Sequence, residues 1–104
     1  IIYTVKYDIR FAETVEEDLK KVKAFYTQKI LNEIREQLTH GPDKETTHRK
    51  ILDGLILPWT AVPPIRQLSV DDYRVFYDVD SEKHIVWIRA VRHKPHGKTT
   101  EEIL

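Results

Sequence analysis

"IRQLSVDDYRVFYDVDSEKHIVWIRAV", residues 65–91, carries the strongest structural signal in the chain. It contains three runs rich in aromatic and β-branched residues, which favour strands: Ile65–Val70, Tyr73–Val79 and His84–Val91. Two acidic residues separate the first run from the second, and "DSEK" at 80–83 has the composition of a tight turn. Short turns place successive strands antiparallel. The sequence therefore predicts a three-stranded antiparallel meander whose central strand is apolar on both faces.

The N-terminal part of the chain predicts a strand followed by a helical segment. In "YTVKYDI", Tyr3–Ile9, apolar and polar residues alternate, as in a strand with one buried face. No Gly or Pro occurs from 13 to 40, and the apolar residues there form one helical stripe: Val15, Leu19, Val22, Tyr26, Ile30, Ile34 and Leu38. Thr14 and Glu17 have the spacing of a capping box, and "HGP" at 40–42 is a helix stop. The spacing fits one long helix or two helices bent near "KAFYT", residues 23–27.

The order of the elements predicts an α+β fold. From Asp43 to Pro64 there is no sustained period, and Gly54 and several prolines interrupt the chain, so we expect a long loop with parts packed on the core. His40 and His48 are expected to be loop residues. Helices that cover one face of an antiparallel sheet complete the predicted architecture. A chain of 104 residues is long enough for one modest core, so we expect a single domain over 1–104.

The composition excludes several classes of protein. The chain has no Cys, which excludes a disulfide framework and a thiolate metal site and favours the reducing cytoplasm. Its longest apolar run, Leu55–Ile65, is too short and too rich in proline to span a bilayer, so we expect no membrane association. Because acidic and basic residues are equal in number, 17 of each, any affinity for nucleic acid must come from a local patch.

Such a patch follows the last predicted strand. Between His84 and Lys98 there is no acidic residue. The cations and imidazoles of this segment are Arg89, Arg92, His93, Lys94, His96 and Lys98. Because the start of one strand lies beside the end of its antiparallel neighbour, we expect Arg74 to lie near Arg92 and Lys94. Strand alternation places Arg92 and Lys94 on one face and His93 on the other.

The residues of this segment alone leave two interpretations open. One is a solvated strand end and tail. The other is a phosphate-binding surface, because Arg and Lys stabilise developing negative charge and histidine transfers protons near neutral pH. The second interpretation requires cations that converge on one surface and are not neutralised by neighbouring acids. The spacing of His93 and His96 also suits metal ligands, but without Cys or a third ligand we expect no metal site.

The segments "RKIL" (49–52), "LSVDDYRVFYDVD" (68–80) and "IVWIRAVRHK" (85–94) resemble the RelE/ParE superfamily of toxins from type II toxin–antitoxin systems. The resemblance covers nearly the whole chain. It implies a helical hairpin broken near Lys23–Tyr26 and a four-stranded antiparallel sheet whose open face carries the active residues. RelE-like members cleave mRNA in the ribosomal decoding site without a metal, whereas ParE-like members inhibit DNA gyrase. A cognate antitoxin neutralises either type.

The resemblance also implies roles for particular residues. The arginine of the family's "YR" pair falls on Arg74, and the arginine that closes the last strand falls on Lys94, which lacks the bidentate fork of arginine. A tyrosine common in RelE-like members is absent, so His93 or His96 is the candidate replacement, with Arg92 as a further catalytic cation. The implied RNA-binding residues are Arg49, Lys50, Arg66 and Lys98.

The leading hypothesis is therefore a toxin that cleaves mRNA on the ribosome and inhibits translation, without a cofactor. Its partners would be an antitoxin, the ribosome and mRNA, with oligomers formed through the antitoxin. The alternatives are a gyrase inhibitor on the same fold and a catalytically degenerate relative that only binds its antitoxin.

Overall fold

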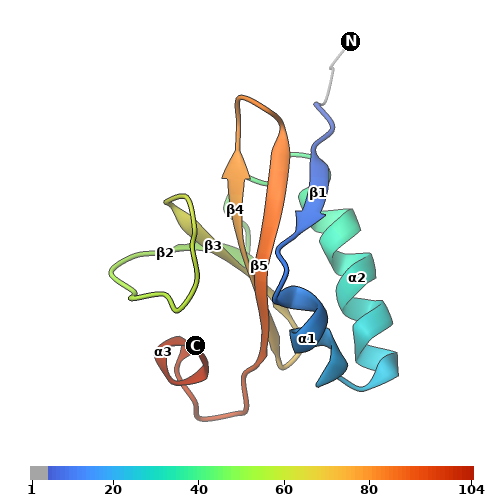
Figure 1. Cartoon of the computed structure of the whole chain (residues 1–104), viewed down its shortest axis with the longest axis vertical. Coiled ribbons are helices and arrows are strands. Elements are labelled where there is room, and N and C mark those ends of the chain that lie inside the picture. The colour runs from blue at the N-terminus through green and yellow to red at the C-terminus, as the bar shows by residue number, and fades with distance from the viewer. Residues whose placement is uncertain (1–4) are drawn as a thin grey trace.

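The computed structural model describes residues 5–104 and contains one mixed, twisted sheet (Figure 1). Five strands lie in the order β1-β5-β4-β3-β2. Their bounds are β1 Asp8–Phe11, β2 Arg49–Leu52, β3 Ile65–Val70, β4 Tyr73–Asp80 and β5 Ile85–His93. The predicted meander is confirmed, because β3, β4 and β5 pair antiparallel through the two short turns. β4 lies at the centre of the sheet.

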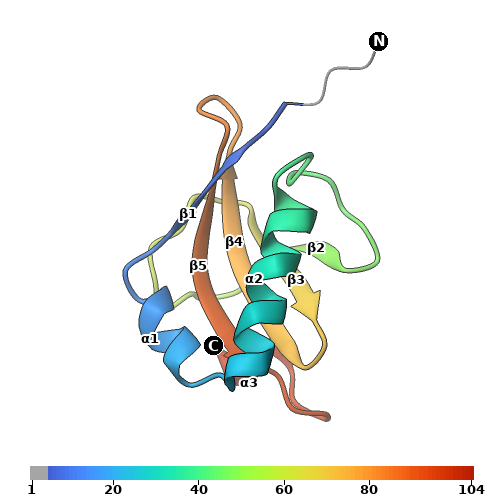
Figure 2. The same ribbon diagram turned by 90° about the vertical axis from the view of Figure 1, so that its right-hand side faces the viewer.

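The N-terminal helical segment forms two helices. They are α1, Val15–Lys20, and α2, Ala24–Leu38, so the chain bends at residues 21–23, just before the implied break. Figure 2 shows α2 lying across one face of the sheet. The predicted helix stop is confirmed, because α2 ends at Leu38, before Gly41 at φ +58°. None of the helices in the described part of the chain is long and apolar enough to cross a membrane.

The predicted helical stripe faces the sheet and forms the main core. Ile30, Ile34 and Leu38 of α2 are fully buried against residues from the same face of β3, β4 and β5, such as Leu68 and Val75. The remaining stripe residues pack around this cluster. A fully buried aliphatic side chain contributes about 1.5–3 kcal/mol. The spacing of apolar residues was thus sufficient to identify the buried face of the helices.

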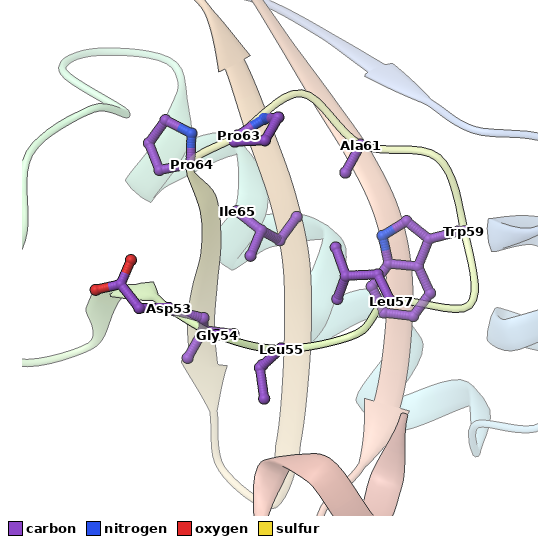
Figure 3. Close-up of a pocket in the computed structure, with 10 residues that line it drawn as sticks. Asp53, Gly54, Leu55, Leu57, Trp59, Ala61, Pro63, Pro64 and Ile65 are labelled. Atoms are coloured by element: carbon purple, nitrogen blue, oxygen red, sulfur yellow. The ribbon is translucent and has the colours of Figure 1, made fainter.

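The second face of the sheet is partly covered, contrary to the open face that the family resemblance implies. The loop 53–64 and the C-terminal helix α3, Thr100–Ile103, lie on this side (Figure 1). Trp59 from the loop and Ile103 from α3 pack against Phe76 and Ala90 of the sheet. The loop borders an open depression of about 520 Å³ that Leu55, Trp59 and Ile65 help to line (Figure 3). This small second core restricts where a ligand can reach the sheet.

Three details of the predicted sheet were wrong. The sheet has five strands rather than four, because "RKIL" forms β2 and pairs with β3 instead of belonging to the loop. It is not fully antiparallel, because β1 pairs with β5 in parallel. The N-terminal strand is shifted from Tyr3–Ile9 to Asp8–Phe11, and Tyr3 and Thr4 lie outside the described residues. Tyr7 and Ile9 belong to the face of this strand that was expected to be buried, and both pack on the core.

The predicted capping box of α1 also differs from the structure. Thr14 is the N-cap residue but makes no side-chain capping hydrogen bond. Its hydroxyl instead donates to the carbonyl of Arg89 on β5 at 3.5 Å. A capping box does form in the last helix, where Thr99 and Glu102 bond reciprocally. The hydroxyl of Thr14 therefore ties α1 to the sheet.

Candidate functional site

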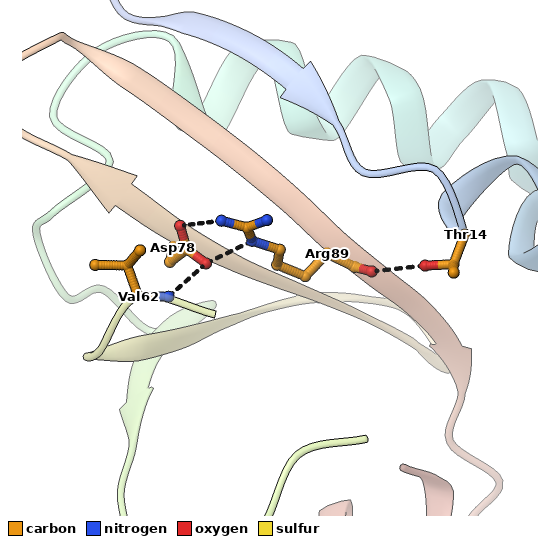
Figure 4. A network of polar contacts seen from close by, with 4 residues as sticks. All are labelled: Thr14, Val62, Asp78 and Arg89. Carbon is orange, nitrogen blue, oxygen red and sulfur yellow. Dashed lines mark hydrogen bonds and ion pairs between the residues drawn. The ribbon is translucent and has the colours of Figure 1, made fainter. Parts of the chain in front are cut away.

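Arg89, the first cation of the basic segment, is neutralised inside the protein. A register shift between Phe76 and Tyr77 places its side chain beside Asp78. Nε and Nη2 of Arg89 donate to the Asp78 carboxylate at 2.6 and 3.2 Å, and the Val62 amide donates to the same carboxylate at 3.2 Å (Figure 4). Asp78 is 1% exposed. The pair anchors the loop 53–64 to the sheet and offers no free charge to a ligand.

Arg92 is also held in an ion pair. Its Nη1 lies 2.6 Å from Oδ2 of Asp18, on α1, and its guanidinium lies 5.5 Å from the centre of the Trp59 ring. Asp18 is nearly buried, and Arg92 retains 28% exposure. As predicted, Arg92 is the register partner of Arg74 across β4 and β5. The expectation of a cluster without acidic partners is therefore wrong for Arg89 and Arg92.

The other predicted residues of the segment spread over different surfaces. His93 lies on the face of the sheet opposite Arg92, as predicted, with its ring 5.1 Å from that of Tyr73. His96 is exposed in the turn 95–98. Lys98 lies 3.5 Å from the carboxylate of Glu102, and both side chains are about half exposed. The structure does not bring these three residues together.

Two of the predicted RNA-binding residues face the helices instead of the second face. Arg49 is 8% exposed, and its Nη1 donates to the carbonyls of Gln37 and Gly41 at the end of α2. Arg66 lies on the same side, next to Tyr77. Burial raises the pKa of Tyr77 to about 12, against the opposing effect of the two guanidinium groups. The Arg49 guanidinium therefore stabilises the fold by holding the end of α2.

Three cations that are at least partly exposed converge, beside the buried Arg49, in a polar depression of about 200 Å³ that we call the cationic hollow. Arg74 of β4, Lys94 after β5 and Lys50 of β2 line it, and among residues 5–104 none of these three forms an ion pair. Its complete lining is Thr46, Thr47, His48, Arg49, Lys50, Gln67, Ser69, Arg74, Lys94 and Thr100. No described carboxylate belongs to this lining. Uncompensated positive charge is thus concentrated at one point of the sheet.

Local geometry explains why Arg74 and Lys94 meet. The turn after β3 places Asp71 at φ +50°, and Nη1 of Arg74 donates to the carbonyls of Asp71 and Tyr73, each at 2.8 Å. The amide of Lys94 donates to the carbonyl of Asp72 at 2.6 Å, which extends the β4–β5 pairing beyond the strands. Both side chains are therefore carried by backbone that is fixed at one end of the central hairpin.

The chemical character of the cationic hollow matches a phosphate group. Lysine and arginine supply charge, and hydroxyl and amide groups supply the neutral hydrogen bonds that phosphate oxygens accept. Thr100 of α3 is fixed at the rim, because its hydroxyl bonds Oε1 of Gln67 at 3.2 Å. His48 belongs to the same lining. In the described part of the chain, no group of three His, Cys, Asp or Glu side chains is placed to hold a metal ion.

A family model for the ParE toxin of the type II toxin–antitoxin system parDE matches residues 9–95. The chain is a toxin of the RelE/ParE superfamily. The match includes β1 from Ile9 onward, α1, α2, the other four strands and Lys94, whereas α3 lies beyond it. A comparison with curated protein sequences found no match.

Solved structures of RelE proteins share the fold of the toxin. The RelBE2 toxin–antitoxin complex from Mycobacterium tuberculosis matches with a TM-score of 0.67 and 23% identity over 86% of this chain and 93% of that chain. The RelE–RelB complex from Pyrococcus horikoshii OT3 matches with a TM-score of 0.67 and 22% identity over 90% of this chain and 99% of that chain. The isolated RelE toxin from E. coli matches with a TM-score of 0.64 and 19% identity over 92% of this chain and 93% of that chain. At these identities the likeness shows the fold alone.

Sequence reasoning missed several residues of the toxin's cationic hollow. His48 lies in the loop before β2, as expected, but it was not expected to line a site, and Gln67 and Thr100 were not considered. The signal that could have found them is the strand "RKIL": once it pairs with β3, Lys50 comes opposite Gln67. His48 precedes this strand and its carbonyl accepts the amide of Ser69 at 2.8 Å. Recognising β2 would therefore have brought His48, Lys50 and Gln67 together, whereas the place of Thr100 depends on how α3 packs on the sheet.

Proposed function

We propose that this toxin is a metal-independent endoribonuclease that cleaves mRNA on the ribosome, with the scissile phosphate in the cationic hollow. The observation that carries the proposal is the convergence of Lys50, Arg74 and Lys94 in a depression without a carboxylate. Cleavage builds negative charge on the phosphate, and fixed donors aimed at that charge are often the largest catalytic contribution. The fold shared with RelE toxins supports the proposal.

Within this proposal, Arg74 and Lys94 stabilise the charged phosphate, and His48 transfers protons. Cleavage without a metal requires a base that takes the proton of the 2′-hydroxyl and an acid that protonates the leaving 5′-oxygen. An imidazole is suited to either task near neutral pH, and His48 is the only histidine in the described lining of the cationic hollow. His93 and His96 are not part of this set, because they lie elsewhere.

The partners follow from the same proposal. The substrate is mRNA bound to the ribosome, which places the toxin in the cytoplasm. Solved relatives form complexes with RelB antitoxins, and we propose that a cognate antitoxin likewise binds and silences this chain and mediates its oligomers. Lys50 binds the RNA backbone in the cationic hollow together with Arg74 and Lys94. Lys98 is half exposed beside Glu102 and adds little charge at the surface.

The decisive experiment adds the purified toxin to translating ribosomes and maps the 5′ ends of the mRNA. We expect new ends within codons, and a loss of about 10²-fold or more in rate for Arg74→Gln or Lys94→Gln, the scale on which one fixed donor acts. The matched control is Lys83→Gln, an exposed lysine in the turn after β4. Stalled translation with intact mRNA, or variants as active as the control, would overturn the proposal.

A second candidate is inhibition of DNA gyrase without catalysis. Two observations favour it: the matching family model is that of a ParE toxin, and the arginines Arg89 and Arg92 are engaged by Asp78 and Asp18. A supercoiling assay with purified gyrase separates the candidates. Inhibition by wild type and equally by Lys94→Gln supports gyrase as the target. No inhibition at saturating toxin removes this candidate.

A further inference from the structure

Strand β5 is longer than its neighbour β1, so part of its edge needs another partner. β1 ends at Phe11, opposite Ile88, whereas β5 continues to His93. The chain after β1 covers this edge in steps. The amide of Ala12 donates to the carbonyl of Ile88 at 2.8 Å, and Thr14 donates to the carbonyl of Arg89. The amide of Val91 then donates to Oδ2 of Asp18 at 3.0 Å. Helix α1 thus replaces a strand along β5.

The same carboxylate oxygen binds Arg92. Nη1 of Arg92 lies 2.6 Å from Oδ2 of Asp18, and the Trp59 ring lies on another side of the guanidinium. Arg74 is the direct register partner of Arg92, and like charges opposite each other on one face of a sheet repel. Asp18 therefore offsets this repulsion and holds Arg92 toward the edge of β5, away from the cationic hollow.

Arg92 retains donors for a ligand in this position. Within residues 5–104 its side chain makes one hydrogen bond, from Nη1 to the carbonyl of Val91, and the same Nη1 forms the ion pair with Asp18. Nε and Nη2 make no hydrogen bond in that part of the chain, and 28% of the side chain is exposed. A guanidinium has five N–H donors in a rigid fork, so one edge can bind a carboxylate while the other binds a phosphate.

We propose that Asp18 is a positioning residue that fixes Arg92 as a second phosphate anchor beside the cationic hollow. This inference rests on the proposed function. The RNA backbone crosses from Arg74 and Lys94 in the hollow over β5 to Arg92, and Asp18 sets the position of this second contact. Asp18 itself touches no substrate. The acid that neutralises Arg92 thereby gives it a fixed direction, which a free arginine on a strand lacks.

A purely structural role for Asp18 is the alternative, because its carboxylate also accepts the Val91 amide. Asp18→Asn separates the two roles. The amide oxygen of asparagine still accepts from the Val91 amide, but the side chain no longer carries the charge that holds Arg92. The matched control is Glu17→Gln, a neighbouring residue of α1 whose side chain is 71% exposed and whose one ion pair within residues 5–104 is with Lys20.

The test is a double-mutant cycle with Asp18→Asn, Arg92→Gln and the combined variant. For ribosomal mRNA cleavage we expect Asp18→Asn to lower kcat by about 10²-fold, the cost of misplacing a fixed group, with an unchanged or lower KM because the charge of Arg92 is released. Arg92→Gln should reduce the salt dependence of single-stranded RNA binding by about 0.7 in log–log slope, as for one lost phosphate contact. In the Arg92→Gln background, Asp18→Asn should change neither quantity.

Two outcomes overturn the inference. In the first, Asp18→Asn is as active as Glu17→Gln. In the second, Asp18→Asn lowers kcat equally with and without Arg92, as a purely structural role of Asp18 would. Failure of the proposed function looks different, because wild type then leaves mRNA intact. In that case the measurement of single-stranded RNA binding decides. The inference is supported if Asp18→Asn changes the salt dependence of binding only when Arg92 is present. It is refuted if the change is the same without Arg92.

Discussion

Replacement of Asp78 by alanine should strongly destabilise the toxin. Asp78 is 1% exposed and accepts hydrogen bonds from Nε and Nη2 of Arg89 and from the Val62 amide. The change leaves a guanidinium with 16% exposure and a loop amide without their acceptor. Removing one partner of a buried ion pair costs about 3–5 kcal/mol. Because Arg89 reaches some solvent, we expect a loss at the lower end, about 3 kcal/mol.

Urea unfolding followed by circular dichroism measures this loss. A loss of about 3 kcal/mol is a large share of the usual stability of 5–15 kcal/mol and lowers Tm by about 12–24 °C in a domain of this size. The control, Glu17→Ala, removes an exposed pair and should cost less than about 1 kcal/mol.

A further variant tests the cause of the loss. Asp78→Leu combined with Arg89→Met replaces the pair by apolar side chains and should recover most of the stability, because the cost comes from an unpaired buried charge. If Asp78→Ala lies within about 1 kcal/mol of wild type, or if the combined variant is no better, the reasoning is refuted.

The remaining predictions concern Arg49 and Lys50, which are adjacent in sequence but lie on opposite faces of the sheet, and two groups with shifted pKa values. Arg49→Gln should lower the free energy of unfolding by about 1.5–3 kcal/mol, measured in urea, because it loses the charged hydrogen bonds to the end of α2. Lys50→Gln should leave this free energy unchanged and lower the affinity for RNA. The reverse pattern would contradict the faces assigned to the two residues. The pKa of Tyr77 is raised to about 12, so the unfolded chain loses its proton first and stability should fall from about pH 10 to pH 12. A pH series of unfolding midpoints checks this decline, which should be weaker in Tyr77→Phe. Hydrogen bonds from Thr99 lower the pKa of Glu102, so α3 should lose this support only as pH falls below the usual range of a glutamate; NMR titration of Glu102 should show a higher pKa in Thr99→Ala.

The parts of the fold that could be predicted have local patterns. The helical stripe and the meander follow from residues close in sequence, whose spacing encodes the buried face. β2 has only four residues, and its identity depends on pairing with β3 rather than on its own pattern. The parallel pairing of β1 with β5 joins residues 8–11 to 85–88, and no local pattern encodes such a distant contact.

The candidate site shows the same division. Arg74 and Lys94 could be predicted together, because a short hairpin brings them near each other. The ion pair of Arg92 could not, because its partner Asp18 lies on a helix at the other end of the chain. Arg49 is a neighbour of Lys50 in sequence but points to the opposite face, so a run of basic residues is not a surface until the strand register is known.

The pairing of β1 with β5 also has a consequence for biosynthesis. During translation, residues 8–11 are made long before their strand partner, residues 85–88. Contacts between such distant segments form late and slow the completion of a sheet. Lys94 and Thr100 of the cationic hollow follow β5 in the chain, so the hollow is complete only after β5 and the residues behind it have been made.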